Sequence, residues 1–134
     1  MEFNKLATAK YHDNGAECNI LDPVSGEPTD FFIKICGADS KVWRKQKKIQ
    51  TRKLLNARSQ SDEPDFDYEK AGIDFEAMDI EALVNATIDW HGLSDNNKEV
   101  KFSKDIANEL YENSPSIVRQ LIDFLGNGEN FTSD

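Results

Sequence analysis

Long apolar runs are absent from this sequence of 134 residues. No stretch approaches the ~20 consecutive apolar residues that a membrane-spanning helix needs. The first residues, MEFNKLATAKYHDNG, also lack the apolar segment of a secretory signal. We therefore expect a cytoplasmic protein with no membrane partner.

Residues that commonly carry catalysis or bind metals are scarce. His12 and His91 are the only histidines, and neither stands at a metal-ligand spacing. A glycine-rich phosphate loop and a nucleophile elbow are both missing. The run EPDFDYEKAG has the alternating acids of a calcium loop, but Lys70 stands where such a loop needs glycine. We therefore expect no metal site, no cofactor and no enzymatic activity.

Charge, by contrast, is plentiful and segregated. Charged residues make up 31% of the chain and the net charge is −9, which favours solubility and argues against binding to nucleic acid or anionic membranes. A helix predicted from Asp39 or Ser40 to about Arg58 carries eight basic residues and no acidic one. The rest of the chain sums to −17, with nine carboxylates and one lysine between Asp62 and Glu81.

The two cysteines lie in the runs ECNILD and FFIKICG, which read as two strands joined by the turn-rich PVSGEPTD. A register with Ile20 opposite Ile33 and Cys18 opposite Ile35 gathers apolar side chains on one face, as a half-buried hairpin requires. Cys36 then points to the other face. We expect two free thiols, in agreement with a reducing compartment.

Three further helices are predicted after an acidic loop at residues 59–73. The first covers about residues 75–90 and is apolar on almost all sides. Ser103 is placed to cap the second helix. Ser114 is placed to cap the third, which has Pro115 at its first position.

These elements predict an α+β fold that is mainly α, with an N-terminal β-hairpin followed by about four helices. The length is near the commonest size of a single domain, so residues 1–134 are expected to form one small domain. Residues 1–15 are predicted to be a flexible tail, and residues 127–134 a C-terminal tail.

The basic helix is the one feature that could carry binding alone. Its cations could neutralise several phosphates in a salt-sensitive contact, and Trp43 could stack on bases. Alternatively, the helix meets the chain's own acidic loop or the acidic face of another copy, through exposed ion pairs that contribute only about 0–1 kcal/mol each. The charge of −17 elsewhere favours a solvated or protein-contacting helix.

The segment that begins WHGLSDNNKEVKFS and runs on to GENF resembles the C-terminal half of a family of tail assembly chaperones from long-tailed bacteriophages. That family shows Trp-x-Gly-Leu, a polar turn, Pro-Phe-Ser, a helix with Leu-Tyr, a proline break and a helix ending near Asn-Phe. LDPVSGEPTDFFIKICGADS also resembles the family's hairpin. The matching residues are Trp90, Gly92, Leu93, Phe102, Ser103, Asn108, Leu110, Tyr111, Pro115, Ile117, Gln120, Phe124, Asn130 and Phe131.

The sequence departs from the family pattern at three places. Lys101 stands where proline usually precedes Phe-Ser, and Ser116 stands where an aromatic residue often follows the proline. Gly128 and Glu129 replace a basic pair before Asn-Phe. The departures at Ser116 and at Gly128 and Glu129 could alter the surface that contacts a partner, and they affect that expectation more than the resemblance to the family.

The resemblance implies a non-enzymatic protein of the host cytoplasm that binds the phage tape measure protein, keeps it soluble and helps recruit tail tube subunits. We interpret the motif residues as the scaffold of a helix–turn–helix corner, in which Trp90 closes a helix, Gly92 permits a turn, and Leu93 and Phe102 anchor its ends. The candidates for partner contact are Trp43, Lys47, Lys48, Ile49 and Leu54.

Two other functions stay open. A nucleic-acid-binding module that uses residues 41–58 predicts a steep loss of binding with salt. A permanent neck or tail subunit predicts that the protein stays in purified particles. An acidic mimic of DNA is disfavoured by the eight clustered cations.

Overall fold

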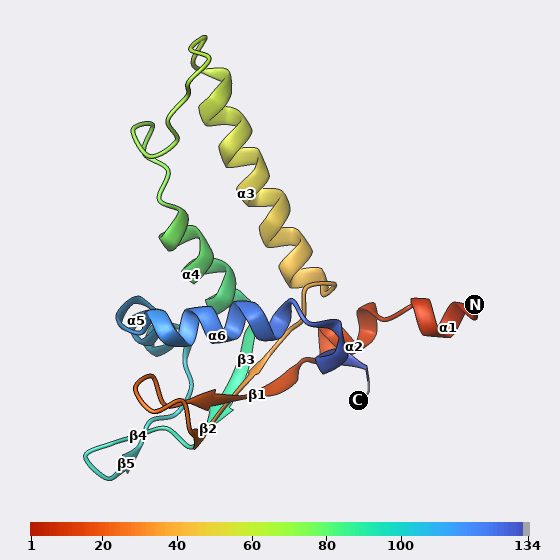
Figure 1. Cartoon of the computed structure of the whole chain (residues 1–134), viewed down its shortest axis with the longest axis vertical. Coiled ribbons are helices and arrows are strands. Elements are labelled where there is room, and N and C mark those ends of the chain that lie inside the picture. Colours follow the sequence, from red (N-terminus) through yellow and green to blue (C-terminus); the bar gives the residue numbers. More distant parts are fainter. Residues whose placement is uncertain (133–134) are drawn as a thin grey trace.

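The computed structural model describes residues 1–132 and has a mixed α+β body from which a helical arm projects (Figure 1). In chain order, its elements are α1 (Phe3–Leu6), α2 (Ala9–Asn14), β1 (Ala16–Leu21), β2 (Pro28–Ile35), α3 (Lys41–Ser59), α4 (Phe75–Ala86), β3 (Thr87–His91), β4 (Ser94–Asp95), β5 (Lys98–Glu99), α5 (Lys104–Asn113), α6 (Pro115–Leu125) and the 3-10 helix η1 (Gly128–Phe131). The predicted α+β class is confirmed, although the hairpin is matched only in part.

The first two strands form the predicted hairpin, but in a different register. Cys18 pairs with Ile33 and Ala16 with Ile35, so the predicted pairing is wrong by two residues. The Asp22 carboxylate accepts the backbone N–H groups of Val24 and Ser25, at 2.8 and 3.0 Å, within the loop of residues 22–27 that joins the two strands. A shift of two residues leaves each side chain on its face, so the predicted apolar set is still buried.

Residues 87–91 form a strand instead of the end of a helix. The helix predicted over residues 75–90 ends at Ala86, and Thr87 already has an extended backbone. Two β-branched residues in a row, Thr87 and Ile88, favour this change because they restrict rotamers in a helix. β3 pairs antiparallel with β2, with Trp90 opposite Ile33, and completes a sheet of order β1-β2-β3. Trp90 is therefore a strand residue.

The polar run after Trp90 folds into a second hairpin. β4 and β5 pair with Asp95 opposite Lys98. Between them, Asn96 and Asn97 have φ values of +51° and +65°, which are the left-handed values of a type I′ turn. The predicted polar turn is therefore an ordered β-hairpin.

The predicted helix starts are otherwise confirmed. The Ser40 hydroxyl accepts the N–H of Trp43 at 3.2 Å at the start of α3. The Ser103 hydroxyl likewise accepts the N–H of Ile106 at 3.1 Å at the start of α5. Ser114 occupies the N-cap of α6 without a side-chain capping bond, and its following proline fills the first helical position.

Both predicted tails take part in the fold. His12 in α2 is 4% exposed and its ring stacks on the ring of Phe131, with ring centroids 4.8 Å apart. Phe131 itself is 1% exposed. Both tail predictions are thus wrong for residues 9–14 and 128–131, because burial of these two rings orders the segments that carry them. The last two residues of the predicted C-terminal tail, 133 and 134, lie outside the described residues.

Candidate partner-binding surfaces

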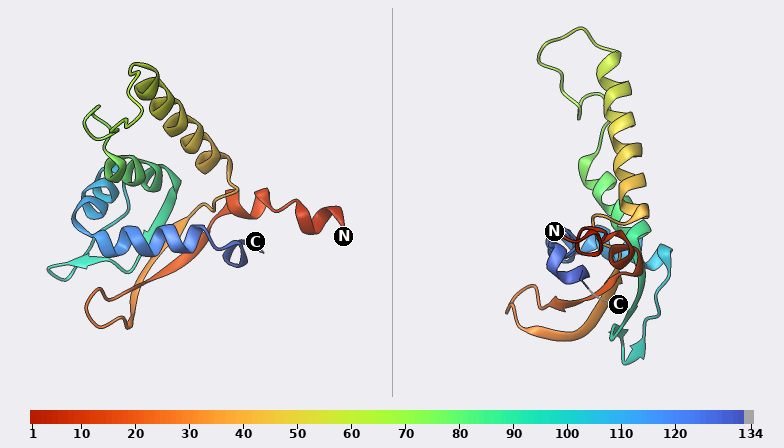
Figure 2. Two further views of the ribbon diagram at one scale, coloured as in Figure 1. Left: turned by 45° about the horizontal axis from the view of Figure 1, so that its top comes forward. Right: turned by 90° about the vertical axis from the view of Figure 1, so that its right-hand side faces the viewer.

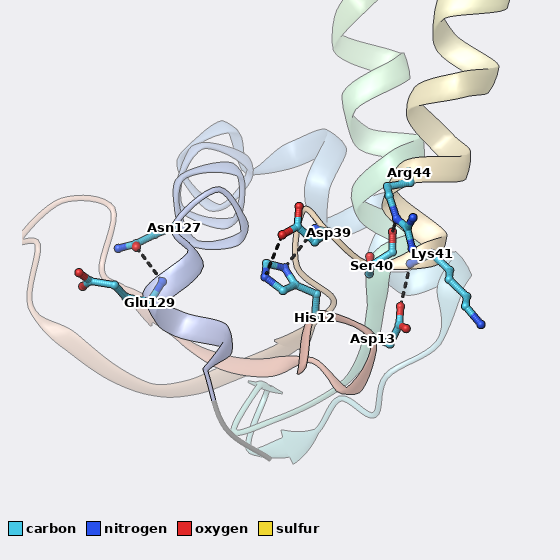
Figure 3. Close-up of polar contacts among 8 residues, drawn as sticks. All are labelled: His12, Asp13, Asp39, Ser40, Lys41, Arg44, Asn127 and Glu129. Atoms are coloured by element: carbon cyan, nitrogen blue, oxygen red, sulfur yellow. Dashed lines mark hydrogen bonds and ion pairs between the residues drawn. The ribbon is translucent and has the colours of Figure 1, made fainter. Parts of the chain in front are cut away.

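The base of the arm is fixed by the N-terminal segment (Figure 3). The Asp13 carboxylate accepts the backbone N–H of Lys41 at 2.7 Å, and Nδ1 of His12 accepts the N–H of Asp39 at 3.1 Å. Ser40, between these two positions, is fully buried. A carboxylate at the start of α3 also interacts favourably with the positive end of the helix dipole. The arm is therefore anchored where it leaves the body.

The arm consists of α3 and the segment 60–74, and α4 leads from it into the core of the body (Figures 1 and 2). α3 has 19 residues and is roughly 28 Å long. α4 packs against it near the body, and the Gln50 side chain donates to the carbonyl of Met78 at 3.0 Å. Farther out, the segment 60–74 returns along the arm without regular structure.

The cations of α3 are not neutralised by the chain's own acids. Within residues 1–132, no lysine or arginine nitrogen lies within 4.0 Å of a carboxylate oxygen. Arg58 of α3 contacts the acidic loop: it donates to the Glu63 carbonyl at 2.7 Å and lies over the Phe66 ring at 5.2 Å from its centroid. The expected meeting of helix and loop therefore involves a backbone carbonyl and an aromatic ring, and no ion pair.

The five predicted contact residues of α3 fall into three groups. Trp43 is buried in the core, so it is not a surface contact and that prediction is wrong in this respect. Trp43 lies in the first turn of α3, whose N–H groups are capped by Ser40 where the arm meets the body. Ile49 and Leu54 are half-buried, while Lys47 and Lys48 are exposed.

Leu55, which is not among the predicted contact residues, belongs to the exposed surface of α3. Leu55 is 64% exposed. It lines an open hollow on the outer side of α3 together with Lys47, Lys48, Thr51 and Arg52. Its spacing from Lys48 and Arg52 is the sequence signal that could have identified it, because residues three and seven apart share a helix face.

Trp90 organises the corner that the motif residues form. Its indole N–H donates to the carbonyl of Val100 at 2.9 Å. Its ring meets Phe31 and Phe102 edge-on, with centroids 5.6 and 5.1 Å away. Leu93 accepts the Val100 N–H at 2.8 Å and packs against the core. These contacts agree with a scaffold role for the corner.

An apolar groove follows this corner along the surface. It consists of two adjoining hollows, of about 410 and 540 Å³, that share Leu93 and Asn113. We call it the corner groove. Its apolar lining is Ile20, Leu21, Pro23, Phe31, Leu93, Val100, Ile106, Leu110, Pro115 and Ile117. Its charged lining residues are acidic: Asp22, Asp95 and Glu109.

Gln120 closes the free edge of β1 next to this groove. Its side-chain oxygen accepts the N–H of Leu21 at 2.8 Å, and its side-chain nitrogen donates to the Leu21 carbonyl at 3.1 Å. The amide thus bonds both backbone groups, as a neighbouring strand would. This contact gives a structural reason for a glutamine at a position that the family resemblance includes, and it protects an edge that could pair with another chain.

Comparisons of the chain with protein-family models, curated proteins and solved structures found no match. Along residues 1–132, none of the helices combines the length and apolar character needed to cross a bilayer. In the same part of the chain, no three His, Cys, Asp or Glu side chains gather as a metal ion would require.

A buried thiol and a buried tyrosine hydroxyl make the protein's stability sensitive to alkaline pH. Both cysteines are free and buried, and burial raises the pKa of Cys18 from 9.0 to about 11. Burial also raises the pKa of Tyr111 from 10.0 to about 12. The Tyr111 hydroxyl lies 2.8 Å from that of Thr87, which donates to the Leu83 carbonyl. Tyr111 is therefore the donor to Thr87.

We expect the free energy of unfolding to fall as pH rises from 9 toward 12. Both pKa values are raised in the folded protein, so the unfolded chain loses its protons first. The stabilisation is complete below the unfolded pKa values, and is lost through about 11 for Cys18 and about 12 for Tyr111. A pKa difference of two corresponds to roughly 2.7 kcal/mol. Urea unfolding at several pH values measures this effect, and Tyr111→Phe should remove the part that Tyr111 contributes between about pH 10 and 12 and leave the part due to Cys18.

Proposed function

We propose that this protein is a non-enzymatic tail assembly chaperone of a long-tailed bacteriophage. In this role it binds the tape measure protein, keeps that chain soluble in the host cytoplasm and helps recruit tail tube subunits. The phage assignment rests on the resemblance of residues 18–131, in which weak motifs follow one another in the family's order. The binding role rests on the arm.

One observation carries the binding role: α3 presents an exposed cationic surface, and none of its cations lies within 4.0 Å of a carboxylate oxygen among residues 1–132. Leu55 adds an apolar contact within that surface, and the anchoring of the helix start holds it in one orientation. Such a surface can bind a partner with acidic and apolar side chains without a large rearrangement. Its charges would mainly guide and orient the contact.

Reversing two of these charges should weaken capture of the tape measure protein. We expect Lys47→Glu combined with Lys48→Glu to reduce the amount captured in a co-expression pull-down roughly tenfold, a loss of about 1.4 kcal/mol. Both side chains are exposed, so the fold should persist and thermal unfolding should change little. The measurement uses the tape measure protein of the same genome, at low and high salt and with nuclease present.

A matched control separates this surface from net charge. Lys5→Glu combined with Arg119→Glu makes the same change in charge at two exposed positions outside α3. This variant should capture the tape measure protein as the unmodified chain does. Equal capture by both double variants would contradict a role for the arm, and no capture by the unmodified chain would contradict the chaperone proposal.

The unpaired cations also support a second candidate, a nucleic-acid-binding module that uses residues 41–58. The same experiment distinguishes it, because nucleic acid retained by the protein should be released by salt and by nuclease. A permanent neck or tail subunit is the third candidate. It predicts that the protein is present in purified particles, from which a chaperone is absent.

A further inference from the structure

We propose that the outer face of α3 in one copy of this protein docks in the corner groove of a second copy. The contact joins two different surfaces of the chain, one from each copy. It concerns the chain's association with itself and goes beyond the proposed function, which concerns another protein.

The donor surface is a stripe along α3. Lys45, Lys48, Arg52 and Leu55 recur at intervals of three and four residues, which places them on one face of the helix. All four side chains are exposed, and the three cations have no carboxylate within 4.0 Å among residues 1–132. The stripe thus combines unpaired positive charge with one exposed leucine.

The acceptor surface has the opposite character. The corner groove is lined by apolar side chains, of which Ile106 is 37% exposed, and its charged lining residues are acidic. Glu109 lines the groove on α5, and Asp105 and Glu112 are exposed on the same helix. These three acids recur at intervals of four and three residues, so they span about 10 Å. The cations at positions 45, 48 and 52 span the same length, which allows the two helices to align.

A single copy cannot bring these surfaces together. α4 packs against both α3 and α5. The far end of α3 and the β4–β5 hairpin, which borders the groove, lie at opposite ends of the molecule in Figure 1 and in the right-hand view of Figure 2. The arm is anchored at its base by Asp13 and Ser40, so it cannot fold back onto the groove. The complementary charges can therefore meet only between copies.

The net charge of −9 opposes this association. Salt screens the repulsion between whole copies as well as the attraction between the two surfaces, so a salt series cannot test the contact. The surfaces are also small and partly polar, which is typical of a weak contact. The test therefore uses charge exchange, read by sedimentation equilibrium up to millimolar protein.

We expect the weight-average mass of the unmodified chain to rise with concentration. Arg52→Glu and Glu109→Arg should each lower the association constant at least about tenfold. The two single variants should associate when mixed, because one supplies an intact groove and the other an intact α3. The double variant should regain association, because it exchanges the charges of the pair. Arg119→Glu is the matched control and should associate as the unmodified chain does.

Three results would overturn the proposal. The first is a chain that stays monomeric at every concentration. The second is association that neither Arg52→Glu nor Glu109→Arg changes. The third is a pair of weakened variants that do not associate when mixed, because the mixture still offers one intact α3 face and one intact groove. A monomeric chain that still captures the tape measure protein would refute self-association and leave the proposed function intact.

Discussion

Replacing Gly92 with alanine should destabilise the protein by more than about 3 kcal/mol, or prevent folding altogether. Gly92 has a φ of +89°, and a Cβ atom placed on it would lie 1.8 Å from the backbone oxygen of Asp30. That oxygen belongs to β2, which is held between its two neighbouring strands. The alanine therefore adds a backbone clash to an unfavourable conformation, each of which costs about 1–3 kcal/mol. Urea unfolding followed by circular dichroism measures the loss.

Gly26→Ala is the matched control for this prediction. Gly26 has a similar φ of +75°, but no atom lies within 4 Å of the position that its Cβ would take. Its substitution should cost only about 1 kcal/mol, from the backbone conformation alone. The difference between the two variants isolates the contact with Asp30. If both variants lose the same stability, the close approach at Gly92 is not what requires glycine.

This requirement explains one position of the Trp-x-Gly-Leu motif physically. Gly92 lets the end of β3 lie directly on the Asp30 backbone, so that Trp90 can reach both Phe31 and Phe102. Leu93 then receives the returning chain through its hydrogen bond with Val100. The motif residues are therefore needed to build the corner groove, whichever partner uses it.

Local signals predicted the helices well and the sheet poorly. The capping serines at positions 40 and 103 act within one turn, so the sequence alone locates the starts of α3 and α5. β3 depends instead on pairing with β2, which lies more than 50 residues earlier. An apolar run that continues from helix into strand shows no break in periodicity at Thr87. The Asn96–Asn97 pair was the one local sign of the second hairpin.

In the candidate surfaces too, the features set by local sequence could be predicted and those set by tertiary packing could not. The basic character of α3 is evident from composition, and the exposure of Lys47 and Lys48 agrees with it. Which apolar residues of that helix face outward is set by tertiary packing, so Trp43 was placed wrongly and Leu55 was overlooked. The corner groove brings residues 20–31 together with residues 93–117. No sequence pattern predicts that juxtaposition.

Phe131→Ala is the second substitution from which we expect a large effect. Phe131 is 1% exposed, stacks on His12 and meets the ring of Phe124 edge-on, with centroids 5.5 Å apart. Removing a buried aromatic ring typically costs about 3–5 kcal/mol. Phe3→Ala makes the same change at a position that is 81% exposed, and should alter stability by less than about 0.5 kcal/mol. Equal losses in urea unfolding would mean that residues 128–131 do not contribute to the core.

Replacing Phe131 with alanine should also loosen the start of α3, at the base of the arm. His12 stacks on this ring and at the same time accepts the N–H of Asp39, and the neighbouring Asp13 accepts the N–H of Lys41. A loosened α2 would therefore release the start of α3. We expect faster hydrogen exchange at the Lys41 amide in Phe131→Ala than in Phe3→Ala, under conditions in which both variants remain folded. Unchanged exchange would show that α2 holds the arm without help from the C-terminal segment, and that the arm's anchor lies entirely in the capping contacts of Asp13 and Ser40.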